Sequence, residues 1–387
     1  MNITIVSEVL GKENNGTTVA AMNLINYLKK QGHNVKVVCP DEDKKGEPGY
    51  YVLSHLNWGK LADKILEKNN VVAAKYDEKI MLEAVKDADV VHFMVPVFIA
   101  HKATLLVESL GIPITAGFHA QAENLTSHLG MQNLSLVNHF VYKIYNHNLF
   151  CRANAIHYPT QFIRDLFEKE IKQKTNGYVI SNGVNNRFKP MVVEKPEHLK
   201  DKFCILFIGR FSKEKSHKIL MKAVEKSKYK DKIQLIFAGD GELKEKVIKY
   251  GNKHLPNPPI IGFYSRDELV RVINYCDLYC HPAEVEIEAI ACLEAITCGL
   301  VPVIANSKKC ATKAFAIDQR SLFKVNDSKD LASKIDYFID NPQEKKLLRE
   351  KYLSNSKTYD QDYCMQQMEQ MLIDVVTQHK NQKKQDK

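Results

Sequence analysis

Two basic residues follow a short apolar segment in the second half of the chain. Gly209 comes directly after that segment, Arg210 is next to it, and Lys215 lies where a helix is expected to begin. Backbone amides at a helix amino terminus attract anions, and nearby cations neutralise them. The pattern predicts a diphosphate site, although a solvated Lys-rich turn would have the same sequence.

Two carboxylates stand further along the chain, on either side of a predicted helix start. Glu286 and Glu294 are eight residues apart, after His281-Pro282 and before Gly299. Carboxylates accept hydrogen bonds from vicinal hydroxyl pairs such as those of a ribose or a hexose. By spacing alone, helix capping and solvation explain both residues equally well. Glu294 is unusual because it lies in a stretch of Ala, Ile, Cys and Leu, where a buried carboxylate needs a partner.

The first half of the chain holds two further candidates. Gly16 lies in the loop that opens the first predicted helix, and His119 follows another apolar segment. The loop lacks the G-x-G-x-x-G dinucleotide fingerprint, which argues against an NAD(P)-dependent dehydrogenase. A lone histidine is usually structural, but one at a strand end is a better candidate for a ligand contact. In the second half, Gly239-Asp240-Gly241 is interpreted as a structural turn.

The elements that position these residues are short apolar segments alternating with helix-period segments. This alternation indicates right-handed βαβ units and parallel sheets, and two such series predict an α/β fold of two doubly wound, Rossmann-like domains. Ligands of such sheets bind at the carboxyl ends of the strands, and the two domains are expected to face a central cleft. The predicted strands are Ile3–Ser7, Asn34–Cys39, Asp89–Met94, Pro113–Phe118, Ala153–His157 and Tyr178–Ser181, then Phe203–Ile208, Gln234–Ala238, Pro259–Gly262, Leu278–His281 and Val301–Ala305.

The domain boundary is predicted in a segment without periodicity. Asn185–Lys202 contains Pro190 and Pro196 and is interpreted as a linker between domains 1–184 and 203–358. Residues 359–377 form a predicted helix that packs back on the first domain. Residues 378–387 are Lys/Gln-rich and are expected to be a disordered basic tail.

Composition and charge exclude several classes of protein. The 387 residues are 44% hydrophobic, which suffices for two cores, and the net charge of +9 is not gathered in a basic block, so we expect no nucleic-acid partner. A positive excess suits an anionic membrane surface or phosphorylated small molecules. Nine Cys without a Cys-x-x-Cys pair indicate reduced thiols in the cytoplasm. The amino terminus lacks the pattern of a signal peptide, and the most apolar stretch, Val90–Ala100, is too short to span a bilayer.

The order of these motifs resembles the retaining glycosyltransferases of family 4, which have the two-domain GT-B fold. The resemblance covers nearly the whole chain. It rests on the Gly-rich first loop, His119, Ile180–Val184, Gly209-Arg210 with Glu214-Lys215, the Glu286-x7-Glu294 pair, and Gly299–Ala305. Within that family, Phe118–Asn124 and His281–Glu288 are similar to bacterial diacylglycerol α-glucosyltransferases (monoglucosyldiacylglycerol synthases).

The resemblance implies a nucleotide-sugar donor, a UDP-hexose, held mainly by the second domain. Arg210 and Lys215 would bind the donor diphosphate, and Glu294 the ribose hydroxyls. Glu286 and His119 would be the catalytic residues in contact with the transferred sugar, and Gly16 would let the first loop approach the diphosphate. No active-site metal and no other cofactor is expected, because the cations and the helix dipole would neutralise the diphosphate.

Two stretches depart from the family pattern. Ile287–Ile290 replaces a Gly-Phe-Gly-like run after the first Glu, and Asn306–Ala311 replaces a double Gly followed by Glu. The sugar pocket is therefore expected to differ from the commonest one.

The leading hypothesis is a hexosyltransferase that acts on a membrane lipid, either diacylglycerol or a ceramide-like lipid, in the cytoplasm and peripherally on the inner face of the cell membrane. One alternative keeps the chemistry with a soluble or cell-wall glycan precursor as acceptor. Another is a non-catalytic nucleotide-sugar-binding protein, which the presence of all four residues Arg210, Lys215, Glu286 and Glu294 disfavours.

A lipid acceptor requires a docking surface, and the sequence offers one candidate in the first domain. Ser54–Asn69 spaces Lys60, Lys64 and Lys68 on one helical stripe beside the apolar Trp58 and other large side chains. This composition suits an interfacial helix on anionic headgroups, although Asp and Glu in the segment also fit an ordinary surface helix.

Overall fold

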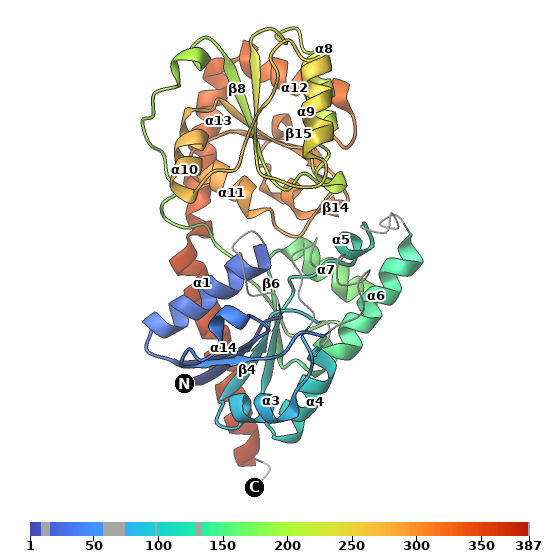
Figure 1. Cartoon of the computed structure of the whole chain (residues 1–387), viewed down its shortest axis with the longest axis vertical. Helices are drawn as coiled ribbons and strands as arrows, with labels where there is room; N and C mark the ends of the chain where they lie inside the picture. The colour runs from blue at the N-terminus through green and yellow to red at the C-terminus, as the bar shows by residue number, and fades with distance from the viewer. Residues whose placement is uncertain (9–15, 57–73, 97–98, 128–133, 386–387) are drawn as a thin grey trace. The chain divides into compact units, whose positions relative to one another are not determined.

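The computed structural model describes residues 1–8, 16–56, 74–96, 99–127 and 134–385. By its contacts the chain divides into two units: unit 1 is Met1–Asn182 with Asp362–Lys387, and unit 2 is Gly183–Gln361. Each unit contains a parallel β-sheet with helices packed on it (Figure 1). The predicted docking segment Ser54–Asn69 lies for the most part outside the described residues, so it stays untested.

Unit 1 contains a seven-stranded parallel sheet of order β3-β2-β1-β4-β5-β6-β7. The central strands β4 and β5 are buried at every position, as parallel strands are when helices cover both faces. The strands are β1 (Asn2–Val6), β2 (Asn34–Cys39), β3 (Tyr50–Val52), β4 (Val90–Phe93), β5 (Ile114–Gly117), β6 (Ala155–Tyr158) and β7 (Gly177–Val179).

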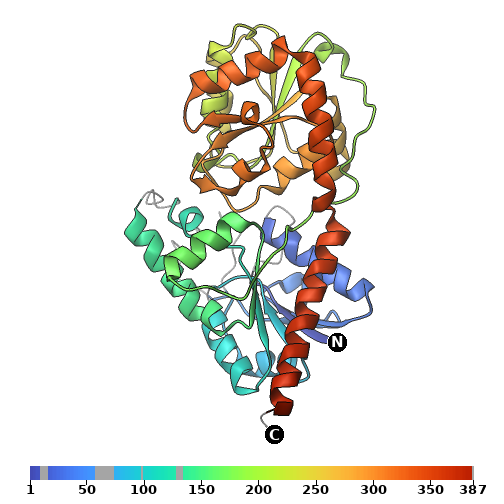
Figure 2. The ribbon, with the colours of Figure 1, turned by 180° about the vertical axis from the view of Figure 1, so that it is seen from behind.

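Helices cover both faces of this sheet. On one face, Leu24 of α1 and Met368 of α14 share a core with Ile5 of β1, and Figure 2 shows α14 running along this side of unit 1. On the other face, Thr4 Oγ1 donates a hydrogen bond to the carbonyl of Ala84 in α3, 2.9 Å away. The helices are α1 (Gly16–Lys30), α3 (Glu78–Val85), α4 (Ala100–Ser109), α5 (Ala122–Ser127), α6 (Ser135–Asn148), α7 (Gln161–Ile171) and α14 (Gln361–Gln385).

The C-terminal helix is longer than the sequence analysis predicts. α14 continues to Gln385, so the prediction of a disordered tail from residue 378 is wrong. Lys and Gln are good helix formers, and the end of α14 is anchored on unit 1. His379 Nε2 and Lys383 Nζ both hydrogen-bond to the carbonyl oxygen of Gly111, at 2.9 and 2.8 Å.

Unit 2 contains a six-stranded parallel sheet of order β10-β9-β8-β11-β13-β15, and a separate two-stranded ribbon of β12 and β14. Its strands are β8 (Phe203–Ile208), β9 (Ile233–Ala238), β10 (Ile260–Gly262), β11 (Leu278–His281), β12 (Val285–Glu286), β13 (Pro302–Asn306), β14 (Lys309–Cys310) and β15 (Leu322–Lys324). Its helices are α8 (His217–Lys226), α9 (Lys244–His254), α10 (Arg266–Tyr275), α11 (Ile290–Thr297), α12 (Ser328–Asp340) and α13 (Pro342–Asn355).

The two Rossmann-like sheets confirm the predicted fold class. All eleven predicted strands are present, with ends that shift by at most two residues. The sequence analysis did not predict β3, β12, β14 and β15. The segment predicted as a linker, 185–202, belongs instead to unit 2, because Phe188 and Leu199 are buried in its core. Among the described helices, none is both long and apolar enough to cross a bilayer.

Candidate functional site

The strand order of unit 2 reverses at β8. β8 pairs with β9 on one side and with β11 on the other. All three strands are parallel, so the loops that follow them emerge at the same edge of the sheet. Doubly wound sheets bind their ligands at such a switch point, beyond the carboxyl ends of the strands. Gly209 and Arg210 directly follow β8 and therefore lie at this position.

Arg210 is a half-buried cation without a counter-charge. Within the described part of the chain, its guanidinium has neither an ion pair nor a hydrogen bond to another residue. A guanidinium stays charged at all physiological pH values and presents a planar set of donors that matches phosphate. An unpaired, half-buried arginine at a switch point is therefore suited to hold an anionic ligand.

Glycines bring the loops after β8 and β9 into contact. A Cβ on Gly239, whose φ is +152°, would lie 2.1 Å from the Gly209 carbonyl oxygen. The amide of Phe211 donates to the carbonyl of Asp240, 2.9 Å away. Since only glycine fits this approach, the packing of the two loops accounts for glycine at position 239.

The helix that follows the β8 loop has no side-chain cap at its amino end. Ser216, with φ +54°, is the N-cap of α8 and makes no side-chain hydrogen bond to the first turn. The first amides of a helix have no intrahelical acceptor, and together with the helix dipole they favour an anion. α8 begins at His217, so Lys215 lies just before the helix, in a short 3₁₀ segment.

Lys215 and Glu286, predicted separately, form an ion pair between Nζ and Oε1. Only 15% of the Lys215 side chain and 16% of the Glu286 side chain are exposed. Glu286 lies in β12, where it pairs with Cys310 of β14. The loops are tied together by the amide of Glu284, which donates to the carbonyl of Glu214 at 2.8 Å. Backbone pairing thus positions both side chains.

Glu294 lies inside α11, and its partner is Arg266 at the start of α10. Arg266 Nη1 donates to Glu294 Oε1 at 2.7 Å. Burial raises the pKa of Glu294, and the adjacent guanidinium opposes that shift. The buried carboxylate thus has the partner that its apolar surroundings require. Glu294 Oε2 accepts no hydrogen bond from any described residue, so one oxygen remains for a ligand.

Buried groups lie beneath these carboxylates. Burial raises the pKa of Tyr279 well above its ordinary value, and the neighbouring Cys292, Glu286 and Glu294 raise it further. His281 Nδ1 lies 3.2 Å from the Tyr279 hydroxyl, while its buried Nε2 has no partner in the described structure. Sequence reasoning marked His281 only as a strand end.

Unit 1 has its own switch point at β1, between β2 and β4. Glu8, two residues after β1, is 2% exposed and was missed by sequence reasoning. Its Oε1 accepts from the amide of Ile99 at 3.2 Å, and no described residue bonds to Oε2. Burial raises the pKa of Glu8 well above its ordinary value. The sequence signal for Glu8 was an acidic residue two positions after an apolar strand.

Gly16 and His119 also belong to unit 1. Gly16 is the first residue of α1, and a Cβ built on it meets no atom within 4 Å, so packing does not require glycine there. The ring of His119 lies 5.4 Å from that of His157, edge to face. Burial, and then His157 and His92, lower the pKa of His119 well below its ordinary value, so the imidazole is neutral near pH 7.

The predicted site residues thus divide between the units. Unit 2 brings Lys215 and Glu286 into contact and places Arg210 at the same edge of its sheet, while Glu294 is paired with Arg266. Gly16 and His119 lie in unit 1. The described residues contain no group of three or more His, Cys, Asp or Glu side chains suited to a metal ion.

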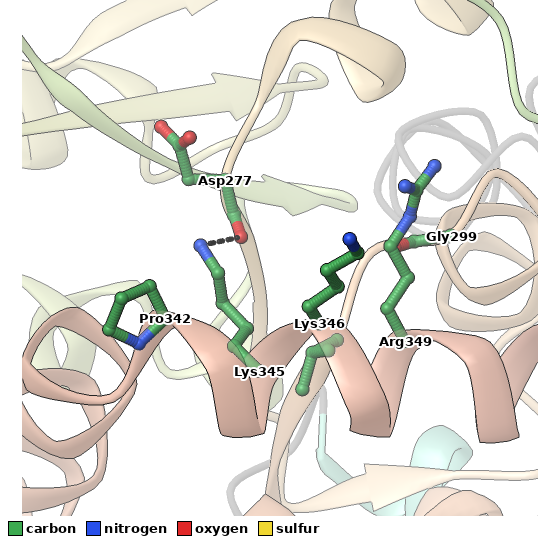
Figure 3. A pocket seen from close by; sticks show the side chains of 7 residues that line it. Asp277, Gly299, Pro342, Lys345, Lys346 and Arg349 are labelled. Atoms are coloured by element: carbon green, nitrogen blue, oxygen red, sulfur yellow. Dashed lines mark hydrogen bonds between the residues drawn. The ribbon is translucent and has the colours of Figure 1, made fainter.

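A pocket of about 170 Å³ lies elsewhere in unit 2, between α13 and the starts of β11 and β13 (Figure 3). Lys345 Nζ donates to the Asp277 carbonyl at 3.2 Å, and Arg349 Nε donates to the Gly299 carbonyl at 3.0 Å. These cations anchor α13 on the backbone at the amino ends of strands. We therefore place the candidate site at the opposite edge, where Arg210 is unpaired.

Comparison with protein families accounts for both halves of the chain. The model for Glycosyltransferase Family 4 matches residues 14–188, and the model for Glycosyl transferases group 1 matches residues 190–357. The chain belongs to glycosyltransferase family 4. Its two Rossmann-like sheets are those of the GT-B fold, as the resemblance implied.

Curated relatives of this family 4 glycosyltransferase differ in the sugar that their names give. The alpha-monoglucosyldiacylglycerol synthase of Acholeplasma laidlawii is 24% identical over 410 residues, covering 99% of both chains. The GDP-mannose-dependent alpha-mannosyltransferase of Mycolicibacterium smegmatis is also 24% identical, over 315 residues and 79% of both chains. The chain is therefore a glycosyltransferase whose donor and acceptor these identities do not decide.

A solved structure has the same fold as the whole chain, and a second one is similar in sequence to part of it. Anabaena Alr3699/HepE, crystallised with UDP and glucose, has a TM-score of 0.71 at 16% identity, covering 97% of this chain and 100% of that one. The catalytic domain of the cholesterol-alpha-glucosyltransferase of Helicobacter pylori is 44% identical, covering 41% of this chain and 98% of that one, with a TM-score of 0.40.

One of the two departures from the family pattern coincides with an unusual backbone conformation. Ala289, in the stretch that replaces the Gly-Phe-Gly-like run, is the N-cap of α11 and has a φ of +60°. A β-carbon in this left-handed region costs about 1 kcal/mol or more. This enzyme thus keeps a conformation that glycine adopts freely while carrying a side chain there.

Proposed function

We propose that this glycosyltransferase moves a hexose, glucose in the first instance, from a UDP-sugar to a membrane lipid and retains the anomeric configuration, so that the glycolipid is α-linked. The unpaired Arg210 at the switch point of unit 2 carries the proposal. A nucleoside diphosphate supplies the negative charge that this guanidinium lacks, and the amino end of α8 adds donors.

The remaining residues of unit 2 have complementary roles in the proposal. Lys215 contributes positive charge to the diphosphate, and Glu286, oriented by Lys215, accepts hydrogen bonds from the sugar hydroxyls. The second oxygen of Glu294 accepts from the ribose hydroxyls while Arg266 holds the first. The roles of Gly16 and His119 follow from the family resemblance and are tested by substitution.

The reaction is a substitution at the anomeric carbon. The acceptor oxygen forms a bond to that carbon on the face that the diphosphate leaves, the bond from carbon to the phosphate oxygen breaks, and the acceptor proton passes to the departing diphosphate. Fixed cations and amides stabilise the developing charge on the leaving group, so the proposal includes no metal ion.

The lipid acceptor is supported by the relative of similar length. The Acholeplasma laidlawii protein is a monoglucosyldiacylglycerol synthase, and this chain aligns with it over 99% of both lengths. A lipid acceptor implies that the enzyme works at a membrane surface, in the proposal the inner face of the cell membrane. Transfer of mannose from a GDP donor is the second candidate, favoured by the mannosyltransferase relatives.

The test is a panel of donors and acceptors. Purified protein is incubated with UDP-glucose, UDP-galactose or GDP-mannose and with diacylglycerol, ceramide or water-soluble glycosides in detergent, and products are identified by mass spectrometry and NMR. We expect an α-glucosyl lipid from UDP-glucose. A β linkage would contradict retention, a mannosyl product would favour the second candidate, and transfer to soluble glycosides alone would overturn the lipid acceptor.

A further inference from the structure

Large apolar side chains are exposed along α6 and the neighbouring α5 of unit 1. Leu136 is 84% exposed and Phe140 66%, and Ile144 continues the line at the next turn. Positions four residues apart lie on the same face of a helix. Leu125 of α5 and Leu134, just before α6, are also about half exposed. We call these five residues the α6 ridge: Leu125, Leu134, Leu136, Phe140 and Ile144.

The opposite face of α6 is firmly packed, so the ridge is not the exposed side of a loose helix. Tyr142 is fully buried and donates a hydrogen bond to Glu123 of α5 at 2.6 Å. Thr126 of α5 donates to Asn138 at 2.7 Å. These bonds fix α5 against α6 and hold the apolar side chains outward. In Figure 1, α6 lies along the outer flank of unit 1 with α5 near its amino end.

The charge around the ridge is neutral to positive. α6 contains no Asp or Glu, and Lys143 and His147 are exposed on it, three and seven residues after Phe140. The single acidic residue of α5, Glu123, is buried under Tyr142. Glu170 of α7 is engaged by His139 Nδ1 at 2.8 Å. The described residues of α5 and α6 include no exposed Asp or Glu, so this apolar line beside Lys143 complements an anionic lipid surface.

We propose that the α6 ridge docks this enzyme on an anionic bilayer, with Leu136 and Phe140 inserted among the acyl chains and Lys143 at the headgroups. The inference rests on the proposed function, since a lipid acceptor must be reached at the membrane. Amphipathic helices bind bilayers by burying apolar side chains and by attraction to anionic lipids. A protein partner would require a matching apolar surface, and the ridge is a narrow line rather than a broad patch.

The test compares two variants on vesicles of phosphatidylglycerol and phosphatidylcholine. The first is Leu136→Ser/Phe140→Ser on the ridge. The matched control is Phe263→Ser, which removes a 74% exposed side chain just after β10 of unit 2. Co-sedimentation measures binding, thermal melting checks the fold, and transfer is assayed with acceptor in vesicles and in detergent micelles. Size-exclusion chromatography with light scattering reports self-association.

We expect the ridge variant to bind vesicles about tenfold or more weakly, because it lacks the two apolar side chains that insert into the bilayer. The Phe263→Ser control should bind like the wild type. Transfer should fall on vesicles and survive in micelles. Equal binding by wild type and ridge variant would overturn the proposal. A wild-type protein that does not bind vesicles would also overturn the proposal. If the wild type is a dimer and the ridge variant is a monomer, the α6 ridge is instead covered by a second copy of the chain. Vesicle binding that depends on the ridge without lipid glycosylation in micelles would leave docking intact and refute the proposed acceptor.

Discussion

Lys215 and Glu286 form an ion pair although 71 residues separate them in the chain. The pair is held by the β12–β14 ribbon and by the bond from the Glu284 amide to the Glu214 carbonyl. A carboxylate held by a lysine keeps a fixed orientation and a second oxygen for a ligand. In the proposed mechanism, Glu286 positions sugar hydroxyls and is not a free nucleophile, because Lys215 already engages one of its oxygens.

Glu286→Gln should therefore lower turnover strongly and leave UDP binding nearly unchanged. The amide keeps the shape of the carboxylate but loses the charge-assisted bonds to Lys215 and to the sugar, for a loss in kcat of about tenfold or more. Steady-state kinetics and calorimetry with UDP measure the two effects. Glu284→Gln, in the same loop, is the control and should behave as wild type. An unchanged kcat for Glu286→Gln would refute the role.

Gly16→Ala tests the first loop without disturbing the fold. A Cβ on Gly16 meets no atom within 4 Å, and alanine is the better helix former at the start of α1. We expect an unchanged or slightly higher melting temperature together with slower transfer and weaker donor binding. Wild-type kinetics in this variant would show that no ligand approaches Gly16.

Chelation tests the proposed independence from metal. In the proposal, Arg210, Lys215 and the amino end of α8 supply the positive potential that a divalent cation would otherwise provide. Transfer after treatment with excess EDTA should match the untreated rate within about twofold. A large loss of transfer activity that added Mg²⁺ or Mn²⁺ reverses would contradict the proposal. A control in zinc-free buffer excludes effects of contaminating metal ions.

Glu8 gives a prediction about stability and pH. Because burial raises its pKa well above the ordinary value, the folded state holds a proton that the unfolded state releases as pH rises above about 4.3. The contribution of Glu8 to stability is thus present at acidic pH and is lost as pH rises towards the folded pKa. Glu8→Gln should raise the melting temperature more at pH 7.5 than at pH 5.

Calorimetric melts of Glu8→Gln and of the exposed Glu78→Gln at both pH values measure this difference. The Glu78 variant should show no comparable pH dependence relative to wild type. Equal shifts for Glu8→Gln at the two pH values would mean that Glu8 is ionised in the folded protein.

Much of the fold was predictable because its strands are continuous buried apolar segments. The missed strands are of a different kind. β12 and β14 are two residues long and exist because their backbones meet, which no local pattern encodes. The helical tail was missed because Lys/Gln-rich sequence is also typical of disorder. The bonds of His379 and Lys383 to Gly111 that anchor it join residues far apart in the chain.

The location of a candidate residue was predictable where it directly follows a strand, as for Arg210 after β8. It was not predictable where a side chain depends on a distant partner. Nothing in the sequence near Glu294 points to Arg266, which precedes it by 28 residues on another helix. Glu8 was missed because a single acid after a strand has many structural explanations, and only its burial distinguishes it.

The central claim is that the switch point of unit 2 holds a nucleoside diphosphate through Arg210. Calorimetric titration of UDP into the wild type, Arg210→Ala and the control Arg271→Ala tests this claim most directly. Arg271 is an exposed residue of α10. Loss of a charge-assisted bond worth about 1.5–3 kcal/mol weakens binding about tenfold or more in Arg210→Ala. The account predicts that loss, with Arg271→Ala equal to wild type and all three proteins melting alike. Equal UDP affinity in Arg210→Ala and wild type would contradict it.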